Sequence, residues 1–199
     1  MTFTGTIGST CLYPLRVIIN VCVWIGIHPN VLTLTGVIIN AVAAWQLGVG
    51  HFRTAGVIMI VANIFDFIDG KVAERTALAS LFGEFWDSVL DRFSDMFLLI
   101  GLIYLYSSLG RTDYVLIASL TLMFSMMTSY TRARAESLID KCKVGFMERP
   151  ERIVLLMIGA FTNRMAAVLW VILVLSVVTV LDRISYTWRE LRTNGKAMA

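Results

Sequence analysis

The sequence has few of the residues that build disulfide frameworks, zinc sites and nucleophilic triads. Its 3 cysteines, Cys11, Cys22 and Cys142, are scattered and lack the spacing of metal ligands. Neither a disulfide framework nor a zinc site is therefore indicated, and we expect these residues to serve in packing. The 2 histidines, His28 and His51, lie in predicted loops with no nucleophile motif nearby. This argues against Ser-His-Asp and Cys-His catalysis.

Charged residues are also scarce. They make up 16% of the chain, whereas 57% of residues are hydrophobic and the mean hydropathy is +0.75. Soluble domains are roughly 45–50% apolar, so this composition predicts a membrane protein. The net charge of +3 comes from basic residues spread over short loops, which does not predict a nucleic-acid-binding surface. The first charge is Arg16, so no basic start of a signal peptide is recognisable and we expect the N-terminus to be retained.

The pattern of apolar runs predicts an all-α integral membrane protein with a single domain over residues 1–199. Residues 9–27 mix Pro14, Arg16 and Asn20 with apolar side chains, which suits an amphipathic helix lying in the membrane interface. The tripeptide at 28–30, His-Pro-Asn, ends this helix. Six transmembrane helices are then expected, over residues 31–49, 54–74, 79–109, 112–137, 149–162 and 165–184.

The distribution of lysine and arginine predicts the topology of these spans. One side of the membrane would carry Lys71, Arg75, Arg132, Arg134, Lys141, Lys143, Arg149, Arg152, Arg183, Arg189, Arg192 and Lys196, and the other only Arg53, Arg111 and Arg164. The side richer in positive charge is normally cytoplasmic. We therefore expect a protein of the cytoplasmic membrane with both termini on the cytoplasmic side.

Four aspartates lie close together in the second and third predicted spans. Asp66 and Asp69 are three residues apart, and Asp87 and Asp91 are four apart, so each pair shares a helix face. We expect the two pairs to face each other from antiparallel neighbours. At about 1.5 Å per residue, a helix over 79–109 is roughly 45 Å long against a hydrocarbon core of about 30 Å. Its acidic half should therefore approach the cytoplasmic interface, where a water-soluble substrate can reach it.

Positive charge must accompany these aspartates. Each one at the centre of a bilayer helix costs about 2.5–3.5 kcal/mol. Ion pairs with Lys71, Arg75 or Arg92 are one solution. Divalent cations explain the clustering better, because Mg²⁺ takes carboxylate oxygens and usually keeps a substrate phosphate in the same shell.

The aspartates belong to a longer pattern that resembles the signature of CDP-alcohol phosphotransferases, D-x2-D-G-x2-A-R-x8-G-x3-D-x3-D. The matching residues are Asp66, Asp69, Gly70, Ala73, Gly83, Asp87 and Asp91. Glu74 stands where the pattern has arginine, and Arg75 follows it. A carboxylate cannot donate hydrogen bonds to phosphate as a guanidinium does, so a nucleotide contact at this point would have to come from Arg75. The segment Pro-Asn-Val-Leu-Thr at 29–33 is similar to the family's entry to the first span.

The resemblance implies a fold, an activity and a set of site residues. It implies six helices after an interfacial helix, a homodimer, and transfer of a phosphatidyl-type group from CDP-diacylglycerol or a similar CDP-lipid to a small alcohol. Asp66, Asp69, Asp87 and Asp91 would bind two Mg²⁺ or Mn²⁺ ions, and Asp91 would also be the catalytic base. The CDP group would contact Asn30, Thr33, Asp69, Gly70, Ala73, Arg75 and Gly83. Asn30 and Thr33 also suit a plain helix start.

Two basic segments bear on the acceptor alcohol. Residues 132–136 read Arg-Ala-Arg-Ala-Glu and residues 148–152 read Glu-Arg-Pro-Glu-Arg. Both are similar to segments of the phosphatidylinositol-phosphate synthase branch and its archaeal relatives, which implies inositol 1-phosphate as the acceptor. Guanidinium groups suit a phosphorylated acceptor, and the candidates are Arg132, Arg134, Arg149 and Arg152. The alternative is that they only anchor the protein at membrane lipid headgroups.

Three other functions compete with this interpretation. The same fold could use glycerol 3-phosphate or serine as the acceptor, and the arginines separate glycerol phosphate from inositol phosphate poorly. A cation transporter is the alternative from another class. It predicts acids near the membrane midplane and a path through the bundle, whereas these acids gather toward one face.

Overall fold

The computed structural model describes residues 13–193, and every regular element in this range is an α-helix. Residues 9–12 of the expected interfacial helix, Cys11 and Lys196 lie outside the described residues. The helices are α2 (Tyr13–Ile25), α3 (Pro29–Gly48), α4 (Phe52–Thr76), α5 (Leu81–Ser108), α6 (Thr112–Glu136), α7 (Arg149–Thr162) and α8 (Met165–Thr193). The prediction of an all-helical chain is confirmed for this range.

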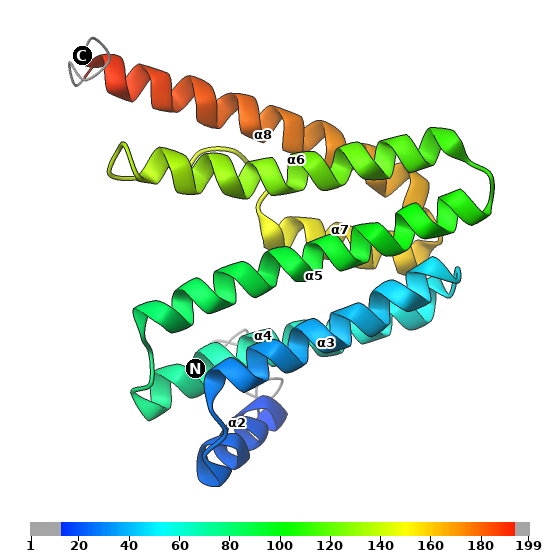
Figure 1. Cartoon of the computed structure of the whole chain (residues 1–199). Coiled ribbons are helices and arrows are strands. Elements are labelled where there is room, and N and C mark those ends of the chain that lie inside the picture. The colour runs from blue at the N-terminus through cyan, green and yellow to red at the C-terminus, as the bar shows by residue number, and fades with distance from the viewer. Residues whose placement is uncertain (1–12, 194–199) are drawn as a thin grey trace, which may run out of the picture.

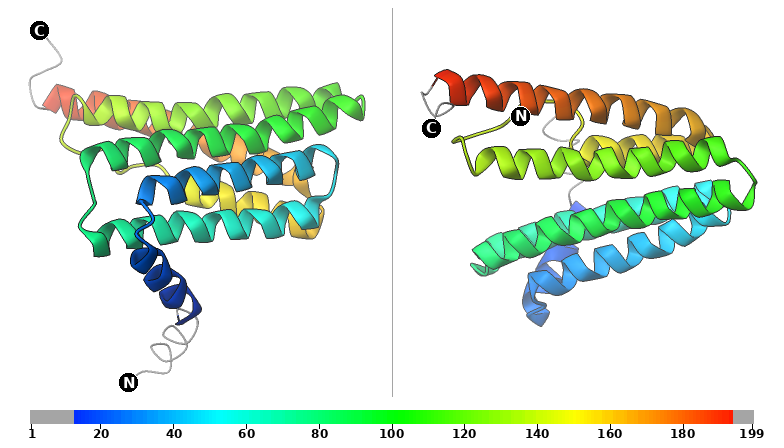
Figure 2. Two further views of the ribbon diagram at one scale, coloured as in Figure 1. Left: turned by 60° about the horizontal axis from the view of Figure 1, so that its bottom comes forward. Right: turned by 45° about the horizontal axis from the view of Figure 1, so that its top comes forward.

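Six of the helices form a ring. Neighbours pack in the order α3, α4, α7, α8, α6 and α5, and α5 closes the ring on α3. A smaller contact joins α5 to α7 across the ring. The helices run roughly along one another, and α2 lies at an angle to them (Figures 1 and 2). α4 and α5 follow each other in sequence but do not pack together, because both pack on α3. The chain thus leaves room between two consecutive helices.

The two halves of the ring differ in character. One half, on the right in Figure 1, is where α3, α5 and α7 end. It is filled by a large cluster of buried apolar residues that includes Leu47, Met59, Leu102 and Leu169. The other half holds the C-terminal part of α4 and the N-terminal part of α5, which carry the aspartates. α7 begins part-way along the bundle, so its first turn reaches this polar half (Figure 1).

Three of the described helices, α3, α6 and α8, are long and apolar enough to cross a membrane. By this criterion three of the six predicted spans are long and apolar enough, and the other three are not. α7 has 14 residues, fewer than the roughly 20 that a span needs. α4 and α5 are long, but their aspartates and basic residues reduce their apolar character.

Helix α2 packs on α4 through one of its faces. Ile19 and Cys22 are buried in a small cluster with Ile68 and Val72 of α4. Other apolar side chains of α2 are exposed, and Trp24 is 87% accessible. An exposed apolar face is what a helix in contact with lipid requires.

Small residues let α3 and α5 approach closely. A Cβ atom added to Gly101 of α5 would collide with the backbone carbonyl of Ala44 on α3. One turn away, a Cβ on Gly48 would lie 3.2 Å from the Tyr104 ring. Glycine at such positions allows helix backbones in membranes to come into contact.

We therefore predict that Gly101→Ala forces α3 and α5 apart and destabilises the protein by about 1–3 kcal/mol, the usual cost of overpacking. The measurement is the melting temperature of the purified protein in detergent. Gly36→Ala is the matched control, because a Cβ there would lie 3.5 Å from the nearest atom, an ordinary contact. Equal melting temperatures for the two variants would contradict the close approach.

Candidate functional site

Three of the four signature aspartates meet between α4 and α5. Asp66, Asp69 and Asp87 each offer a carboxylate oxygen, and these oxygens lie within 4.8 Å of one another. Asp66 and Asp69 of α4 thus face Asp87 of α5, as expected for three of the four aspartates. The two helices do not pack directly on each other, because both pack on α3, and the carboxylates face each other across a cleft. The three- or four-residue spacing places the two aspartates of each helix on one face. The cleft between the helices arises because α4 and α5 both pack on α3.

The cleft has a volume of about 370 Å³ and is lined by α3, α4 and α5. Its walls include nearly all the residues that the resemblance assigns to the nucleotide: Asn30, Thr33, Asp69, Gly70, Ala73 and Gly83. A Cβ on Gly70 would meet no atom within 4 Å, so the wall is open at this point. Ser80 caps α5 by accepting a hydrogen bond of 3.0 Å from the backbone N–H of Gly83.

Arg75 does not line this cleft. Its guanidinium donates a hydrogen bond of 2.5 Å to Asn20 of α2, and it lines a separate groove beside that helix. Glu74 lines the cleft instead and forms a 2.6 Å ion pair with Lys71. One helical position rotates the side chain by about 100°, so that Glu74 borders both the cleft and the groove whereas Arg75 borders only the groove.

Asp91 lies apart from the group of three carboxylates. Its Oδ1 is 2.9 Å from Nη1 of Arg149, and the same nitrogen is 2.9 Å from Oδ2 of Asp66. The first residue of α7 therefore joins α4 to α5 with a single guanidinium. Because Asp66 lines the cleft and Asp91 lines a second cavity, Arg149 stands between the two.

This second cavity has a volume of about 140 Å³ and is strongly charged. Its walls are built from α5, α6, α7 and α8 and contain five arginines and three carboxylates, a formal excess of two positive charges. The charged residues are Asp91, Arg92, Asp95, Arg132, Glu148, Arg149, Arg152 and Arg183. Asp66 and Glu136, which do not line the cavity, pair with Arg149 and Arg132 and offset this formal excess. Several guanidinium groups around one cavity are nevertheless the donors that suit a phosphate monoester.

Buried ion pairs hold the arginines of α7 in place. Arg152 donates to Oδ2 of Asp95 from Nε and Nη2, at 3.1 and 2.5 Å, and to the Thr128 hydroxyl at 3.0 Å. Both side chains of the Arg152–Asp95 pair are 4% exposed. A buried charge that loses its partner is strongly destabilising, so this pair constrains where α7 can start.

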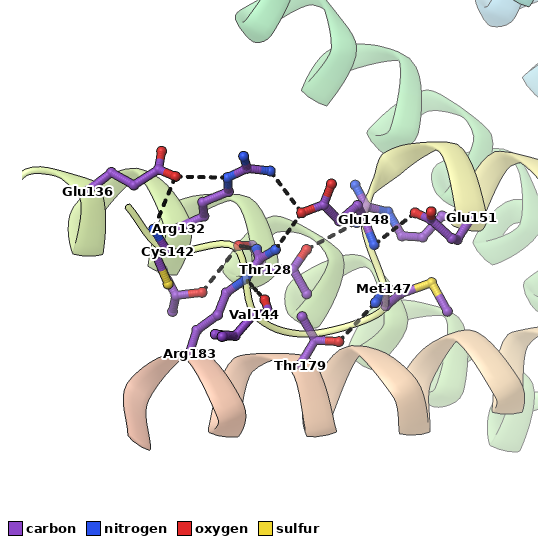
Figure 3. Close-up of polar contacts among 12 residues, drawn as sticks. Thr128, Arg132, Glu136, Cys142, Val144, Met147, Glu148, Glu151, Thr179 and Arg183 are labelled. Carbon is purple, nitrogen blue, oxygen red and sulfur yellow. Dashed lines mark hydrogen bonds and ion pairs between the residues drawn. The ribbon is translucent and has the colours of Figure 1, made fainter. Parts of the chain in front are cut away.

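Two further arginines meet at Glu148, the residue before α7. Arg132 of α6 and Arg183 of α8 both donate to Glu148 Oε1, at 2.8 and 3.0 Å, as Figure 3 shows. Arg132 also pairs with Glu136 at 3.2 Å. Arg183 is buried and donates to the backbone carbonyls of Thr128 and Val144.

The structure brings together three of the four arginines predicted for the acceptor. Arg132, Arg149 and Arg152 line the charged cavity, whereas Arg134 donates to Ser137 and faces an apolar groove.

Sequence reasoning missed Asp95, Glu148 and Arg183 as parts of this site. Asp95 continues the four-residue spacing of Asp87 and Asp91, so it lies on the same helix face. Arg183 is a charged residue that follows a long apolar run. Both could therefore have been identified from the sequence.

The residues of the cleft fit a divalent metal ion. The three clustered carboxylates are hard oxygen ligands of the kind that Mg²⁺ and Mn²⁺ prefer. Asp69 is buried, and its Oδ2 has no hydrogen-bond partner among the described residues. A buried oxygen without a partner is costly, and a cation would supply the missing interaction.

Comparisons with known proteins point in the same direction. A family model described as CDP-alcohol phosphatidyltransferase matches residues 26–181. The archaetidylinositol phosphate synthase of Methanothermobacter thermautotrophicus is 33% identical over 174 residues, which cover 84% of this chain and 87% of that protein.

Solved structures of one enzyme are also similar to this chain. The crystal structure of Mycobacterium tuberculosis phosphatidylinositol phosphate synthase with CDP-DAG bound has a TM-score of 0.81 and 25% identity, over 87% of this chain and 93% of that chain. The same enzyme in complex with manganese and citrate has a TM-score of 0.80 and 26% identity, over 87% and 88%.

We predict that Asp69→Asn and Asp87→Asn each weaken Mn²⁺ binding by about tenfold or more, because even changes outside the ligand shell commonly cost about 10–100-fold. Electron paramagnetic resonance of Mn²⁺ titrated into the purified protein measures this directly. Asp113→Asn is the control, since this exposed aspartate pairs with Arg111 and lies outside both cavities. Unchanged affinity in both cleft variants would exclude the carboxylates as ligands.

Proposed function

The chain belongs to the CDP-alcohol phosphatidyltransferase family, and from this we propose that it transfers a phosphatidyl-type group from a CDP-lipid to inositol 1-phosphate, with release of CMP. The observation that carries the proposal is the pair of adjoining cavities. One is a carboxylate cleft suited to a metal-bound pyrophosphate, and the other is an arginine-rich cavity. Arg149 and Asp91 lie where the two cavities adjoin.

The donor is assigned to the cleft between α4 and α5. Its glycine and alanine positions leave space beside the carboxylates, and the M. tuberculosis relative was crystallised with CDP-DAG. We assign the CDP group to Asn30, Thr33, Asp69, Gly70, Ala73 and Gly83. The lipid is CDP-diacylglycerol or an ether analogue, since the relatives include an archaeal enzyme as well as a bacterial one.

Asp66, Asp69 and Asp87 would hold the divalent metal, Mg²⁺ or Mn²⁺, and Asp91 joins them if two ions bind as the family resemblance implies. The manganese complex of the M. tuberculosis enzyme supports the use of such a metal. When bound, metal ions of this kind neutralise charge on the pyrophosphate and on the departing CMP.

The acceptor is assigned to the arginine-rich cavity. Arg132, Arg149 and Arg152 offer forked donors to its phosphate, and Asp91 lies in the same cavity. Asp91 is therefore placed to take the proton from the acceptor hydroxyl. The hydroxyl oxygen then attacks the phosphorus that carries the lipid, a new P–O bond forms, and the P–O bond to CMP breaks.

Glycerol 3-phosphate is the second candidate acceptor, because its phosphate complements the same charge. Serine lacks a phosphate and would not use the arginines of the cavity in this way.

We further propose that α3 to α8 form one membrane domain of six spans and that α2 lies in the interface. The exposed apolar side chains of α2 support the second assignment. The excess of lysine and arginine on the polar side supports a cytoplasmic position for the site and both termini. A homodimer rests on the family resemblance alone.

The function is tested by CMP release from CDP-diacylglycerol with Mg²⁺ or Mn²⁺, with each acceptor offered separately. We predict turnover with inositol 1-phosphate and a rise in its KM of about 10- to 150-fold in Arg132→Ala, because one charge-assisted hydrogen bond contributes roughly 1.5–3 kcal/mol. Its KM for the CDP-lipid should change little. Turnover with glycerol 3-phosphate or serine, but never with inositol 1-phosphate, would contradict the acceptor assignment.

The position of Arg75 leads to a separate prediction. Because its side chain is directed to α2, Arg75→Ala is expected to leave CDP affinity nearly unchanged. Glu74→Arg should increase CDP affinity, since it puts a guanidinium on the wall of the cleft. Calorimetric titration of CDP in the presence of Mg²⁺ distinguishes the two variants, and a large loss in Arg75→Ala would place this arginine at the nucleotide.

A further inference from the structure

Four of the five arginines of the charged cavity fall into two groups according to the acid that neutralises them, and the fifth, Arg92, donates to Ser88. Arg149 and Arg152 pair with aspartates of α4 and α5, which are fixed on helices deep in the ring. Arg132 and Arg183 have a different partner, because both contact one oxygen of Glu148. This second group depends on a carboxylate at the end of a loop.

The Glu148 carboxylate makes the contacts that a phosphate oxygen would make. Its Oε1 accepts from Arg132 at 2.8 Å and from Arg183 at 3.0 Å, so two guanidiniums converge on a single acidic oxygen (Figure 3). The side chain lines the same cavity that we assign to the phosphorylated acceptor.

Glu148 is also the acid in this cavity that can most easily move. Its side chain is 39% exposed, against 16% for Asp91 and 4% for Asp95. The Glu148 backbone N–H donates to Oε2 of Glu151 in the capping box of α7, and the Glu148 side chain accepts from the Glu151 backbone N–H in the same box. A rotation of the side chain away from the arginines would break the second of these bonds but keep the first, so the start of α7 stays capped.

The arginines would keep their positions if Glu148 left them. Arg183 is held by the backbone carbonyls of Thr128 and Val144, and Arg132 by Glu136. The loop that leads to Glu148 is fixed on α8, since the Met147 N–H donates to the Thr179 hydroxyl at 3.0 Å. Gly145, at φ +89°, lies so close to Thr179 that a Cβ atom would clash with it.

We propose that Glu148 is a built-in anion that holds Arg132 and Arg183 in the empty cavity and gives them up to the phosphate of the acceptor. The proposal rests on the proposed function only in placing that phosphate in this cavity. Glu148 thereby favours phosphorylated acceptors, because a neutral alcohol cannot replace the charge that the two guanidiniums would lose. The exchange substitutes one anion for another, so the buried Arg183 always has a counter-ion.

The test is the affinity for inorganic phosphate of Glu148→Gln, measured by calorimetry on the full-length protein in detergent. Glutamine keeps the volume and an acceptor oxygen but removes the competing charge. Phosphate should therefore bind about tenfold more tightly than in wild type, which corresponds to about 1.4 kcal/mol. The KM for inositol 1-phosphate should fall with it, while the KM for the CDP-lipid stays unchanged.

Glu151→Gln is the matched control. It removes the same charge one turn along α7 and keeps an oxygen for the cap, but within residues 13–193 Glu151 forms no ion pair with an arginine, unlike Glu148. Phosphate affinity in this variant should stay close to wild type. Equal gains in the two variants would reduce the effect to general electrostatics and overturn the proposal. A loss of phosphate affinity in Glu148→Gln would also overturn it, because Glu148 would then support the site rather than compete for it.

A structure of the wild-type protein with inorganic phosphate tests the same idea if Glu148→Gln does not fold. Phosphate on Arg132 and Arg183, with the Glu148 carboxylate turned away, is the expected result. Phosphate bound elsewhere, with Glu148 still on both arginines, would overturn the proposal. Tighter phosphate binding in Glu148→Gln without any turnover of inositol 1-phosphate would refute the acceptor assignment and leave the role of Glu148 intact.

Discussion

The structure depends on the neutralisation of charge inside a helical bundle that has an apolar surface. Aspartates and arginines inside such a bundle are costly without partners, and several of them are paired with residues of other helices. Arg149 is the clearest case, because its guanidinium contacts Asp66 of α4 and Asp91 of α5 at 2.9 Å each. α4 and α5 do not pack together, and this arginine of α7 joins them across the opening. The ion pairs thus shape the polar half of the ring, while apolar packing shapes the other half.

The same need for charge neutralisation determines where the metal ion and the substrates would bind. Three carboxylates gather in the cleft, where a divalent cation can bind them, and only Asp66 among them is paired with an arginine. Arginines in excess of acids gather in the cavity next to it. A metal-bound pyrophosphate and a phosphorylated alcohol would therefore occupy adjoining cavities, with Asp91 where these adjoin. Phosphoryl transfer needs mainly positioning and charge neutralisation, and this arrangement provides both. Glu148 is a further case of charge neutralisation, since it would neutralise Arg132 and Arg183 until a substrate anion replaces it.

Sequence reasoning reached the helical fold and the acidic residues because both leave local signals. Apolar runs predict helices, and acids spaced three or four apart share a helix face whatever the rest of the chain does. The prediction of six spans was less successful, since three helices meet the length and composition criterion. The spans were counted from apolar runs, whereas α4 and α5 carry the charges of the site and α7 starts inside the bundle.

The sequence by itself therefore determined which residue types form the site and which helix faces present them. Tertiary structure decided which charges meet. Asp66 and Arg149 are 83 residues apart, and Glu148 and Arg183 are 35 apart, so no local spacing relates them. The tertiary fold also separated Arg134 and Arg75 from the cavities, because the packing of the helices decides which groove each helix face borders. Helical periodicity is a local property of the chain, whereas the pairing of buried charges depends on how the helices pack around the ring.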